Sequence, residues 1–587
     1  MTIIEKLSKL RSLMQDNNLG MYFIPTDDYH TSEYVGSYFK SRAFMSGFTG
    51  SAGQLLVTLD KAYLWTDGRY FLQAEEQLKG STIELMKMGE QGVPTVFEFI
   101  KNYKGKKSLG FDGRCVLATF GKKLETIENL EINPNLDLVN EIWTDRPELS
   151  HEKGYELDLK YAGLEREKKL DKIRENLINK DADLTVISSL DDIMWTLNLR
   201  GNDVTCNPVI LSYLVVDRDK AILYLNESVL DTNLKKTLAK AKIITKPYDS
   251  IYGDVLNYEA KKIIIDPSKT NYKMLKNILL HNSVIEERNI TTDLKARKNK
   301  VEIANFRQAH LKDAVAMVKF MYWLKTNVGK IPMTELSVSE KLLNFRKEQS
   351  HFLDISFGTI AGFGPHGAIV HYSATKETNA NITLNNLLLV DSGAHYLEGT
   401  TDITRTFALG KVSDEMKHHF TLVLKCYLAL SDIKFIKGVT GQTLDLAARE
   451  ALWSEGYDFN HGTGHGVGYV MNVHEGPQGI KYNRVQEAFD EGMITSDEPG
   501  LYLAGKYGIR HESLVLTKKY METEFGTFLQ FEPITLVPFD LDGIDKTLLT
   551  KEEKDKLNEY HDRVYKKVSP FLTEKEAKFL KKYTKAI

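Results

Sequence analysis

One stretch constrains this chain more than any other, Leu387 to Leu409, because it carries Asp391 and Asp402 eleven residues apart. It opens on an apolar run that is typical of a buried strand, and turn-forming residues separate the two aspartates. A strand, a turn and a second strand would bring both carboxylates into one place. Two adjacent carboxylates repel unless a cation or a proton neutralises one of them. The alternative is a pair of surface aspartates, the commoner position for this residue type.

The composition is that of a soluble globular protein with several domains. The 587 residues exceed a single core, and this length suggests about three or four domains. The net charge of -3 gives no electrostatic argument for nucleic acid or an anionic membrane as a partner. Only three cysteines occur, far apart and without metal-ligand spacing, which argues against a disulfide framework and fits a reducing compartment.

The first residues are predicted to form an amphipathic helix of the folded domain. Leu7, Leu10 and Met14 recur at helical spacing, and charged residues between them exclude the apolar core of a signal peptide. No run of about 18 apolar residues occurs, so no transmembrane helix is expected. We therefore expect a cytoplasmic protein that binds neither membrane nor nucleic acid.

The chain is predicted to have an α/β (α+β) architecture with an internal repeat. Helix and strand patterns alternate over residues 1–149, and residues 150–297 follow the same plan. A shift of 163 positions places the apolar residues of the first helix on Leu170, Ile173 and Leu177. Chance agreement between two amphipathic helices is the open alternative. The sequence therefore favours two related domains.

A third domain is predicted over residues 298–587. A charged segment leads into a long helical pattern, and glycine and histidine become frequent from there to Pro538. The tail, about residues 541–587, has helical periodicity and is rich in lysine and glutamate. We expect it to be a helical extension, and its sequence shows no chemistry of its own.

Histidines and acids after the two aspartates indicate a metal site. His461, His465 and His474 lie within fourteen residues, and the glycines around the first two argue against a helix there. An isolated histidine is usually a hydrogen-bonded core or surface residue, but three together favour function. Glu498 and Glu512 then flank a second strand–turn–strand pattern.

Four carboxylates with one histidine give five candidate ligands. This donor set suits Mn²⁺, Co²⁺, Fe²⁺ or Zn²⁺, and the carboxylate majority favours Mn²⁺. Four carboxylates also balance the charge of two divalent ions, which favours a dinuclear site. Two metals roughly 3.5–4 Å apart can hold a bridging hydroxide and polarise a carbonyl. The predicted chemistry is hydrolysis.

Sequence motifs in all three predicted domains point to one family. They follow one another in order along nearly the whole chain: RAFMSGFTGSAG (42–53), WTDGRYFLQA (65–74), LNLRGNDV (197–204), LKARKNKVEIANFRQAH (294–310), DSGAHYLEGTTDITRT (391–406), HGTGHGVG (461–468), NVHEGP (472–477) and FEPITLVP (531–538). Together with the candidate ligands they resemble the pita-bread metallopeptidases, and most closely the large, three-domain cytosolic Xaa-Pro aminopeptidases.

The resemblance implies a fold and an activity. The fold would be two creatinase-like N-terminal α/β domains followed by a pita-bread catalytic domain. The activity would be metal-dependent hydrolysis of the N-terminal Xaa-Pro bond of peptides by a homodimer. A prolidase acting on Xaa-Pro dipeptides is the nearest alternative, although the three-domain length favours the aminopeptidase. A catalytically inactive pita-bread module that binds peptides or proteins is the alternative of another class.

The resemblance also implies a role for each candidate ligand. Asp391 would bind one metal ion, and Asp402 and Glu512 would bridge both ions. His465 and Glu498 would complete the coordination of the other ion. Glu498 would in addition take the proton of the bridging water.

Five further residues are implied to act around the metals. His371, His461 and His474 would contact the substrate, with His474 beside the proline. Arg510 would brace the bridging carboxylates through charge-assisted hydrogen bonds. Arg69 would reach the peptide, from its own subunit or from the partner of a homodimer. For Arg69 an ordinary position at a helix start is the open alternative.

Overall fold

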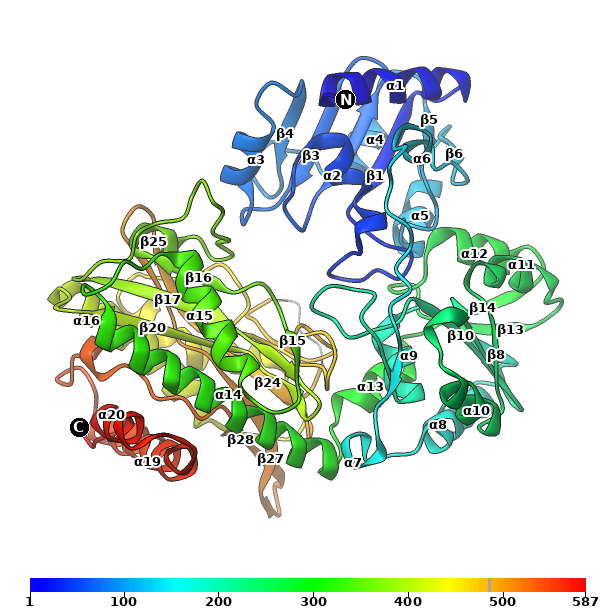
Figure 1. Ribbon diagram of the computed structural model, residues 1–587. Helices are drawn as coiled ribbons and strands as arrows, with labels where there is room; N and C mark the ends of the chain where they lie inside the picture. Colours follow the sequence, from blue (N-terminus) through cyan, green and yellow to red (C-terminus); the bar gives the residue numbers. More distant parts are fainter. Residues whose placement is uncertain (484–486) are drawn as a thin grey trace. The chain divides into compact units, whose positions relative to one another are not determined.

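The computed structural model describes residues 1–483 and 487–587, and the chain divides into two compact units (Figure 1). The first unit holds residues 1–157 and 165–291, and the second holds residues 158–164 and 292–587. Among the described residues, no helix has the length and apolar character needed to cross a membrane.

The first unit contains two six-stranded sheets of the same topology. Their strand orders are β4-β3-β2-β1-β5-β6 and β12-β11-β10-β8-β13-β14. Corresponding neighbours are parallel or antiparallel in the same pattern in both sheets. The strands are β1 (Met21–Pro25), β2 (Gln54–Thr58), β3 (Ala62–Thr66), β4 (Ile83–Lys87), β5 (Ser108–Gly110), β6 (Glu131–Asn133), β8 (Leu184–Ile187), β10 (Ser212–Asp217), β11 (Ala221–Leu225), β12 (Ile243–Pro247), β13 (Lys262–Ile265) and β14 (Ser283–Glu286).

A helix precedes the first strand of each sheet and buries the predicted apolar stripe. In α1 (Ile3–Asp16) the stripe is Leu7, Leu10 and Met14, and in α8 (Arg166–Asn179) it is Leu170, Ile173 and Leu177. The predicted repeat is therefore confirmed. The remaining helices of four or more residues in this unit are α2 (Ser41–Ser46), α3 (Phe71–Gln77), α4 (Val96–Asn102), α5 (Ala118–Glu125), α6 (Leu138–Ile142), α9 (Leu190–Leu197), α10 (Thr232–Lys240), α11 (Ile251–Asp254) and α12 (Tyr272–Leu279).

In the second unit, helices pack against small, mostly antiparallel sheets. Its longest helix begins at a capping box, in which Asn299 and Glu302 exchange side-chain and backbone hydrogen bonds. One apolar core joins α14 (Lys300–Asn327), α15 (Glu335–Lys347), α16 (Asp414–Ser431), α19 (Lys551–Val568) and α20 (Glu574–Tyr583) to the strands below. The predicted C-terminal helices thus belong to the core of this unit.

The strands described in this unit form two main sheets and three smaller ladders. The main sheets have the orders β16-β17-β20 and β21-β28-β27-β24, and the smaller ladders are β15-β18-β19, β22-β23 and β25-β26. Their bounds are β15 (Phe352–Ile355), β16 (Ile360–Phe363), β17 (Asn386–Ser392), β18 (Ala394–Tyr396), β19 (Gly399–Thr400), β20 (Ile403–Leu409), β21 (Lys434–Ile436), β22 (Gly464–His465), β23 (Gly479–Ile480), β24 (Ile494–Asp497), β25 (Gly500–Leu503), β26 (Tyr507–Arg510), β27 (Ser513–Thr523) and β28 (Gly526–Pro533).

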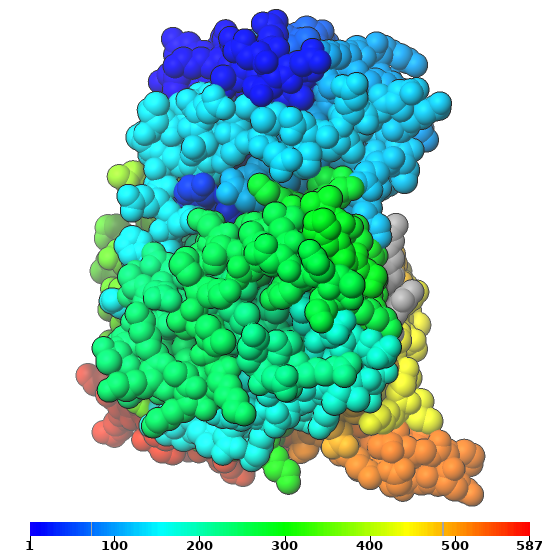
Figure 2. Space-filling model, turned by 90° about the vertical axis from the view of Figure 1, so that its right-hand side faces the viewer, coloured from blue at the N-terminus to red at the C-terminus, as the bar shows by residue number. Residues whose placement is uncertain are grey.

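The β27–β28 hairpin projects from the body of the second unit (Figure 2). Residues 518–525 at its end are all exposed, whereas the first five residues of β27 are buried. The buried end of β27 pairs with β24. The metal-ligand candidates lie beside this buried end.

Candidate metal centre

Paired strands bring the two aspartates to one end of a ladder. Asp391 lies in β17 directly opposite Thr404 of β20, and Asp402 immediately precedes β20. Both aspartates are buried. The strand–turn–strand arrangement predicted for this stretch is therefore present, with the short strands β18 and β19 inserted between the two arms.

The two glutamates also lie at strand ends. Glu498 follows β24 and Glu512 precedes β27, and these two strands pair through Asp497 and Ser513. The β25–β26 hairpin fills the chain between the two glutamates. The backbone N–H of Glu512 donates to the carbonyl of Thr404 at 3.1 Å, which ties this ladder to the strand of the aspartates.

His465 turns one ring nitrogen toward these acids. Its Nδ1 lies 3.0 Å from the carbonyl of Gly466, and because a carbonyl only accepts, Nδ1 carries the proton. Its Nε2 is then free of hydrogen in the neutral ring and lies 3.4 Å from Asp402 Oδ2 and 3.5 Å from Glu498 Oε1. This tautomer suits a metal ligand.

Three of the five predicted ligands converge closely. Ligand atoms of Asp402, His465 and Glu512 all lie within 4.8 Å of one another. Glu498 adjoins this group through His465, whereas Asp391 is held by Arg510, whose guanidinium donates to Asp391 Oδ2 at 2.6 Å.

The other carboxylate oxygen of Asp391 is available to bind a cation. Asp391 Oδ1 is buried and receives no hydrogen bond from the residues that the structure describes. An unpaired buried carboxylate oxygen is costly, and a cation satisfies it. This orphaned atom and the oxygen-rich donor set both fit divalent metal ions.

Burial and neighbouring charges shift the pKa of several groups in this cluster. Burial raises the pKa of Asp391, Glu498 and Glu512, and for Glu512 the neighbouring Asp402 raises the pKa further. Burial lowers the pKa of His465, but the hydrogen bond to Asp402 and the charge of Glu498 outweigh it and bring the pKa to about 9. Several acids and one basic ring thus share a small buried volume, which is a donor set suited to divalent cations.

A hydrogen-bonded chain behind the ligands includes two residues that the sequence did not identify. Arg510 donates to Tyr502 Oη at 2.7 Å and to Thr404 Oγ1 at 3.2 Å. Tyr502 Oη lies 2.8 Å from His461 Nε2, and Thr404 Oγ1 donates to Glu512 Oε2 at 2.6 Å. Burial and the charge of Arg510 lower the pKa of His461 to about 3. Neither Thr404 nor Tyr502 has a distinctive sequence spacing that could have identified it.

The other two predicted substrate histidines lie in different settings. The rings of His474 and His465 meet edge to face, with their centroids 4.3 Å apart. His371 is partly exposed in a turn after the short helix η5 (Gly364–Ala368). Its neighbour Tyr372 donates its hydroxyl to the buried carboxylate of Glu335 at 2.8 Å.

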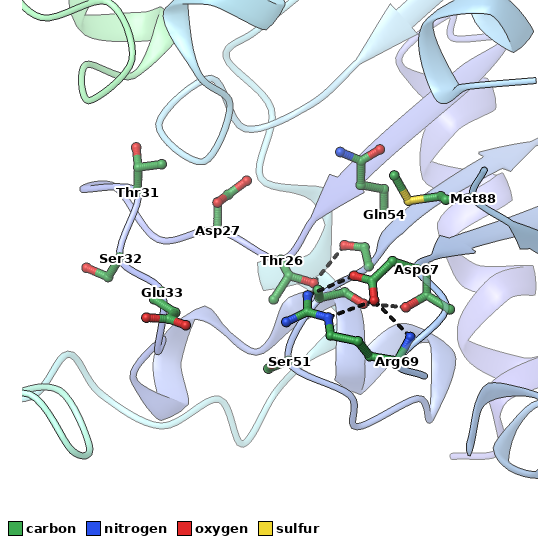
Figure 3. Close-up of a pocket in the computed structure, with 13 residues that line it drawn as sticks. Thr26, Asp27, Thr31, Ser32, Glu33, Ser51, Gln54, Asp67, Arg69 and Met88 are labelled. Atoms are coloured by element: carbon green, nitrogen blue, oxygen red, sulfur yellow. Dashed lines mark hydrogen bonds and ion pairs between the residues drawn. The ribbon is translucent and has the colours of Figure 1, made fainter. Parts of the chain in front are cut away.

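Arg69 belongs to the first unit, where it lines a pocket of about 380 Å³ (Figure 3). Its side chain forms two hydrogen bonds of 2.8 Å with the carboxylate of Asp67. The acids Asp27 and Glu33 line the same pocket. The two hydrogen bonds to Asp67 hold the Arg69 side chain in a fixed orientation at the pocket wall.

Comparison with known proteins identifies the family. The family model described as "Metallopeptidase family M24" matches residues 304–519, and its C-terminal region matches residues 527–587. Two models of the creatinase/prolidase N-terminal domain match residues 6–142 and 145–302. Xaa-Pro aminopeptidase 1 of Dictyostelium discoideum is 38% identical over 97% of this chain and 94% of its own. The chain belongs to the Xaa-Pro aminopeptidases of metallopeptidase family M24.

Two other aminopeptidases of this kind are also similar to the chain over most of its length. Aminopeptidase P2 of Arabidopsis thaliana is 39% identical over 97% of this chain and 86% of its own. An X-prolyl aminopeptidase of Caenorhabditis elegans, described as a cytosolic enzyme with a di-nuclear active site, superposes with a TM-score of 0.94. Its crystal structure is 36% identical and covers 100% of both chains. These matches confirm the predicted fold, two creatinase-like domains followed by a pita-bread domain.

Proposed function

We propose that this chain is a metal-dependent aminopeptidase that hydrolyses the N-terminal Xaa-Pro bond of peptides. The observation that carries the proposal is the convergence of Asp402, His465 and Glu512 within 4.8 Å, in a chain that Xaa-Pro aminopeptidases match over nearly its whole length. Glu498 and Asp391 adjoin this group and complete a set of five donors.

Two divalent ions fit this donor set, with Mn²⁺ favoured by its carboxylate majority and Co²⁺ or Zn²⁺ as alternatives. Asp391 would hold one ion through its unpaired Oδ1, and His465 and Glu498 would hold the other. Asp402 and Glu512 would contact both ions. When bound, the two ions would activate a water molecule and polarise the scissile carbonyl.

Glu498 is proposed to take the proton of the attacking water and pass it to the leaving nitrogen. Burial raises the pKa of this carboxyl, which suits a group that must both accept and release a proton. Ser496 Oγ donates to Glu498 Oε1 at 3.2 Å and holds the carboxylate in place.

His371, His461 and His474 are proposed to contact the substrate. A proline nitrogen carries no N–H and its ring is rigid, so its site needs a flat wall and a hydrogen bond to the preceding carbonyl. Imidazole rings supply both. His461 suits the role of a neutral ring, because its pKa is lowered to about 3 by burial and by Arg510.

Two arginines are proposed to assist. The resemblance implies that Arg510 braces the bridging carboxylates, but its guanidinium donates to Asp391 instead. Arg510 would therefore fix the orientation of Asp391 while Tyr502 fixes Arg510. Arg69 would bind the peptide away from the metals, within its own subunit or across a homodimer. A cytoplasmic location is proposed because only three cysteines occur, far apart in the sequence, which fits a reducing compartment.

Activity on defined peptides tests this proposal. Metal-stripped protein should release the first residue from an Xaa-Pro-Yaa tripeptide after addition of Mn²⁺, and Glu498→Gln should lower kcat by at least about a hundredfold. A Glu491→Gln variant, which changes an exposed acid nearby, serves as the matched control.

The same assay separates the alternatives. Faster turnover of Xaa-Pro dipeptides than of tripeptides would identify a prolidase. Peptide binding without turnover in the presence of Mn²⁺, Co²⁺ and Zn²⁺ would identify an inactive binding module and refute the proposal.

A further inference from the structure

Arg405 is a fully buried residue of β20. Its side chain contacts the main chain of Glu512, a proposed metal ligand. Its guanidinium donates to the carbonyl of Glu512 and, at 2.9 Å, to the carbonyl of Thr404. Glu512 lies between β26 and β27, outside either strand, and its own N–H donates to Thr404. Thr404 and Arg405 therefore fix both backbone polar groups of Glu512.

The side chain of Glu512 is held by Thr404. Thr404 Oγ1 donates to Glu512 Oε2 at 2.6 Å, so the carboxylate is oriented by the residue adjacent to Arg405. Metal sites require their ligands to be held within about 0.5 Å of the productive geometry. A loss of the Arg405 contact would therefore let the carboxylate drift together with its main chain.

The other edge of the guanidinium faces the chain after β28. Arg405 donates to the carbonyl of Val537 at 2.8 Å, to the carbonyl of Pro538 at 3.3 Å and to Tyr560 Oη at 3.0 Å. Its guanidinium carbon lies 4.1 Å from the centroid of the Phe539 ring. A planar group with five donors can bridge separate segments in this way, whereas a lysine could not.

Helix α19 of the C-terminal extension holds that segment in turn. Tyr560 Oη lies 2.8 Å from the carbonyl of Val537 and 3.1 Å from that of Thr535. The N–H of Phe539 donates to His561 Nε2 at 3.1 Å. Tyr560 and His561 are both buried. The contacts thus run without a gap from α19 through Arg405 to Glu512.

We propose that Arg405 is a positioning residue through which the C-terminal extension fixes Glu512 for metal binding. The extension, residues 541–587, then contributes to the metal centre although it supplies no ligand. This inference rests on the proposed metal site. Residues that orient metal ligands typically affect metal affinity or activity by about 10–100-fold.

Tyr560→Phe tests the inference with the removal of one oxygen atom. Metal-stripped protein is titrated with Co²⁺, and binding is followed by the visible absorption of the bound ion. We expect the Co²⁺ dissociation constant to rise roughly tenfold in Tyr560→Phe and more in Arg405→Lys. The absorption band should also shift, because the ligand geometry changes.

Tyr583→Phe is the matched control. Tyr583 lies on α20 of the same extension and donates its hydroxyl to Asp542 at 2.7 Å, away from Arg405. It should lose a similar amount of thermal stability and bind Co²⁺ like the wild type. Thermal unfolding of each variant shows that the protein is folded before titration.

The outcomes separate the two proposals. If the wild type binds no Co²⁺, the proposed metal site fails. If the wild type binds Co²⁺ and folded Tyr560→Phe binds it with the same affinity and spectrum, Arg405 has no positioning role and the inference is wrong. Equal weakening in Tyr560→Phe and Tyr583→Phe would also overturn it, because the effect would then be one of general stability.

Discussion

At the scale of single residues, the two aspartates of the opening stretch differ in their surroundings. Asp402 lies close to His465 and Glu512. Asp391 has one oxygen hydrogen-bonded to Arg510, and its other oxygen accepts no hydrogen bond within the described parts of the chain. Two buried aspartates thus have different neighbours, which suits them to different roles in metal binding. The difference arises because Asp391 lies next to Arg510, whereas Asp402 lies next to His465 and Glu512.

This difference predicts unequal effects of Asp402→Asn and Asp391→Asn on metal content. Asp402 is proposed to contact both ions, so its replacement should lower the metal content from about two ions to less than one per chain. Asp391→Asn should chiefly weaken one ion and leave about one. Elemental analysis after gel filtration gives the stoichiometry. Equal loss in both variants would contradict the assignment of Asp402 as a bridging ligand.

At the scale of elements, the turn that carries His371 depends on a single buried acid. Glu335, the first residue of α15, accepts hydrogen bonds from the N–H groups of Phe363 and Ala380, both at 2.9 Å. It also accepts from Tyr372 Oη at 2.8 Å and pairs with His366 Nδ1 at 2.9 Å. The sequence gives no sign of this role, because an acid in the first turn of a helix is common.

Glu335→Gln should therefore make this turn more mobile and leave the metal content unchanged. An amide offers a donor where one carboxylate oxygen accepts, so the two donors on that oxygen lose their acceptor. We expect kcat/KM for an Xaa-Pro-Yaa peptide to fall roughly tenfold, mostly through a higher KM, because about 1.4 kcal/mol corresponds to one such factor.

Glu340→Gln on the exposed side of the same helix provides the comparison. It should leave both KM and metal content at wild-type values. Loss of bound metal in Glu335→Gln, or an unchanged KM, would show that Glu335 does not act through the turn that carries His371.

At the scale of the whole molecule, the two N-terminal lobes form one unit. Asn271 Nδ2 donates to the carbonyl of Tyr29 at 2.9 Å, and His30 Nδ1 lies 2.8 Å from the carbonyl of Ser188. These buried contacts join the two sheets, so both lobes fall into one compact unit. The limits 1–149, 150–297 and 298–587 remain predictions.

The stability of the second unit should depend on pH through His561. Burial, and then the charge of Arg405, lower the pKa of His561 to about 3, whereas an unfolded histidine has a pKa of about 6.5. Below pH 6.5 the unfolded chain therefore binds a proton that the folded chain excludes, and the free energy of unfolding falls by about 1.4 kcal/mol per pH unit.

Chemical unfolding at about pH 7.5 and about pH 5 measures this effect. His561→Gln should be less stable than the wild type at the higher pH but should lose about 2 kcal/mol less on acidification. His281→Gln, at an exposed position, should follow the wild type at both pH values. An unchanged pH dependence in His561→Gln would show that this ring is not excluded from protonation.

The fold class and the candidate ligands could be predicted from the sequence, and the repeat was indicated by it and confirmed by the two sheets of equal strand order. The spacing of Leu7, Leu10 and Met14 predicted a buried helical face, which the structure confirms, because periodicity reports which side of an element is apolar. Motifs around Asp391 and Glu512 predicted a metal site, because the residue type alone defines which donor atoms a side chain offers.

The hydrogen bonds that hold those residues in place could not be predicted from the sequence. Thr404, Tyr502 and Glu335 have no distinctive spacing, and they matter because strands and turns from distant parts of the chain meet there. The same holds for Arg405, which lies about 155 positions from Tyr560 yet donates to its hydroxyl. Hydrogen-bond partners of buried groups are set by packing in three dimensions, and local sequence patterns do not encode such long-range contacts.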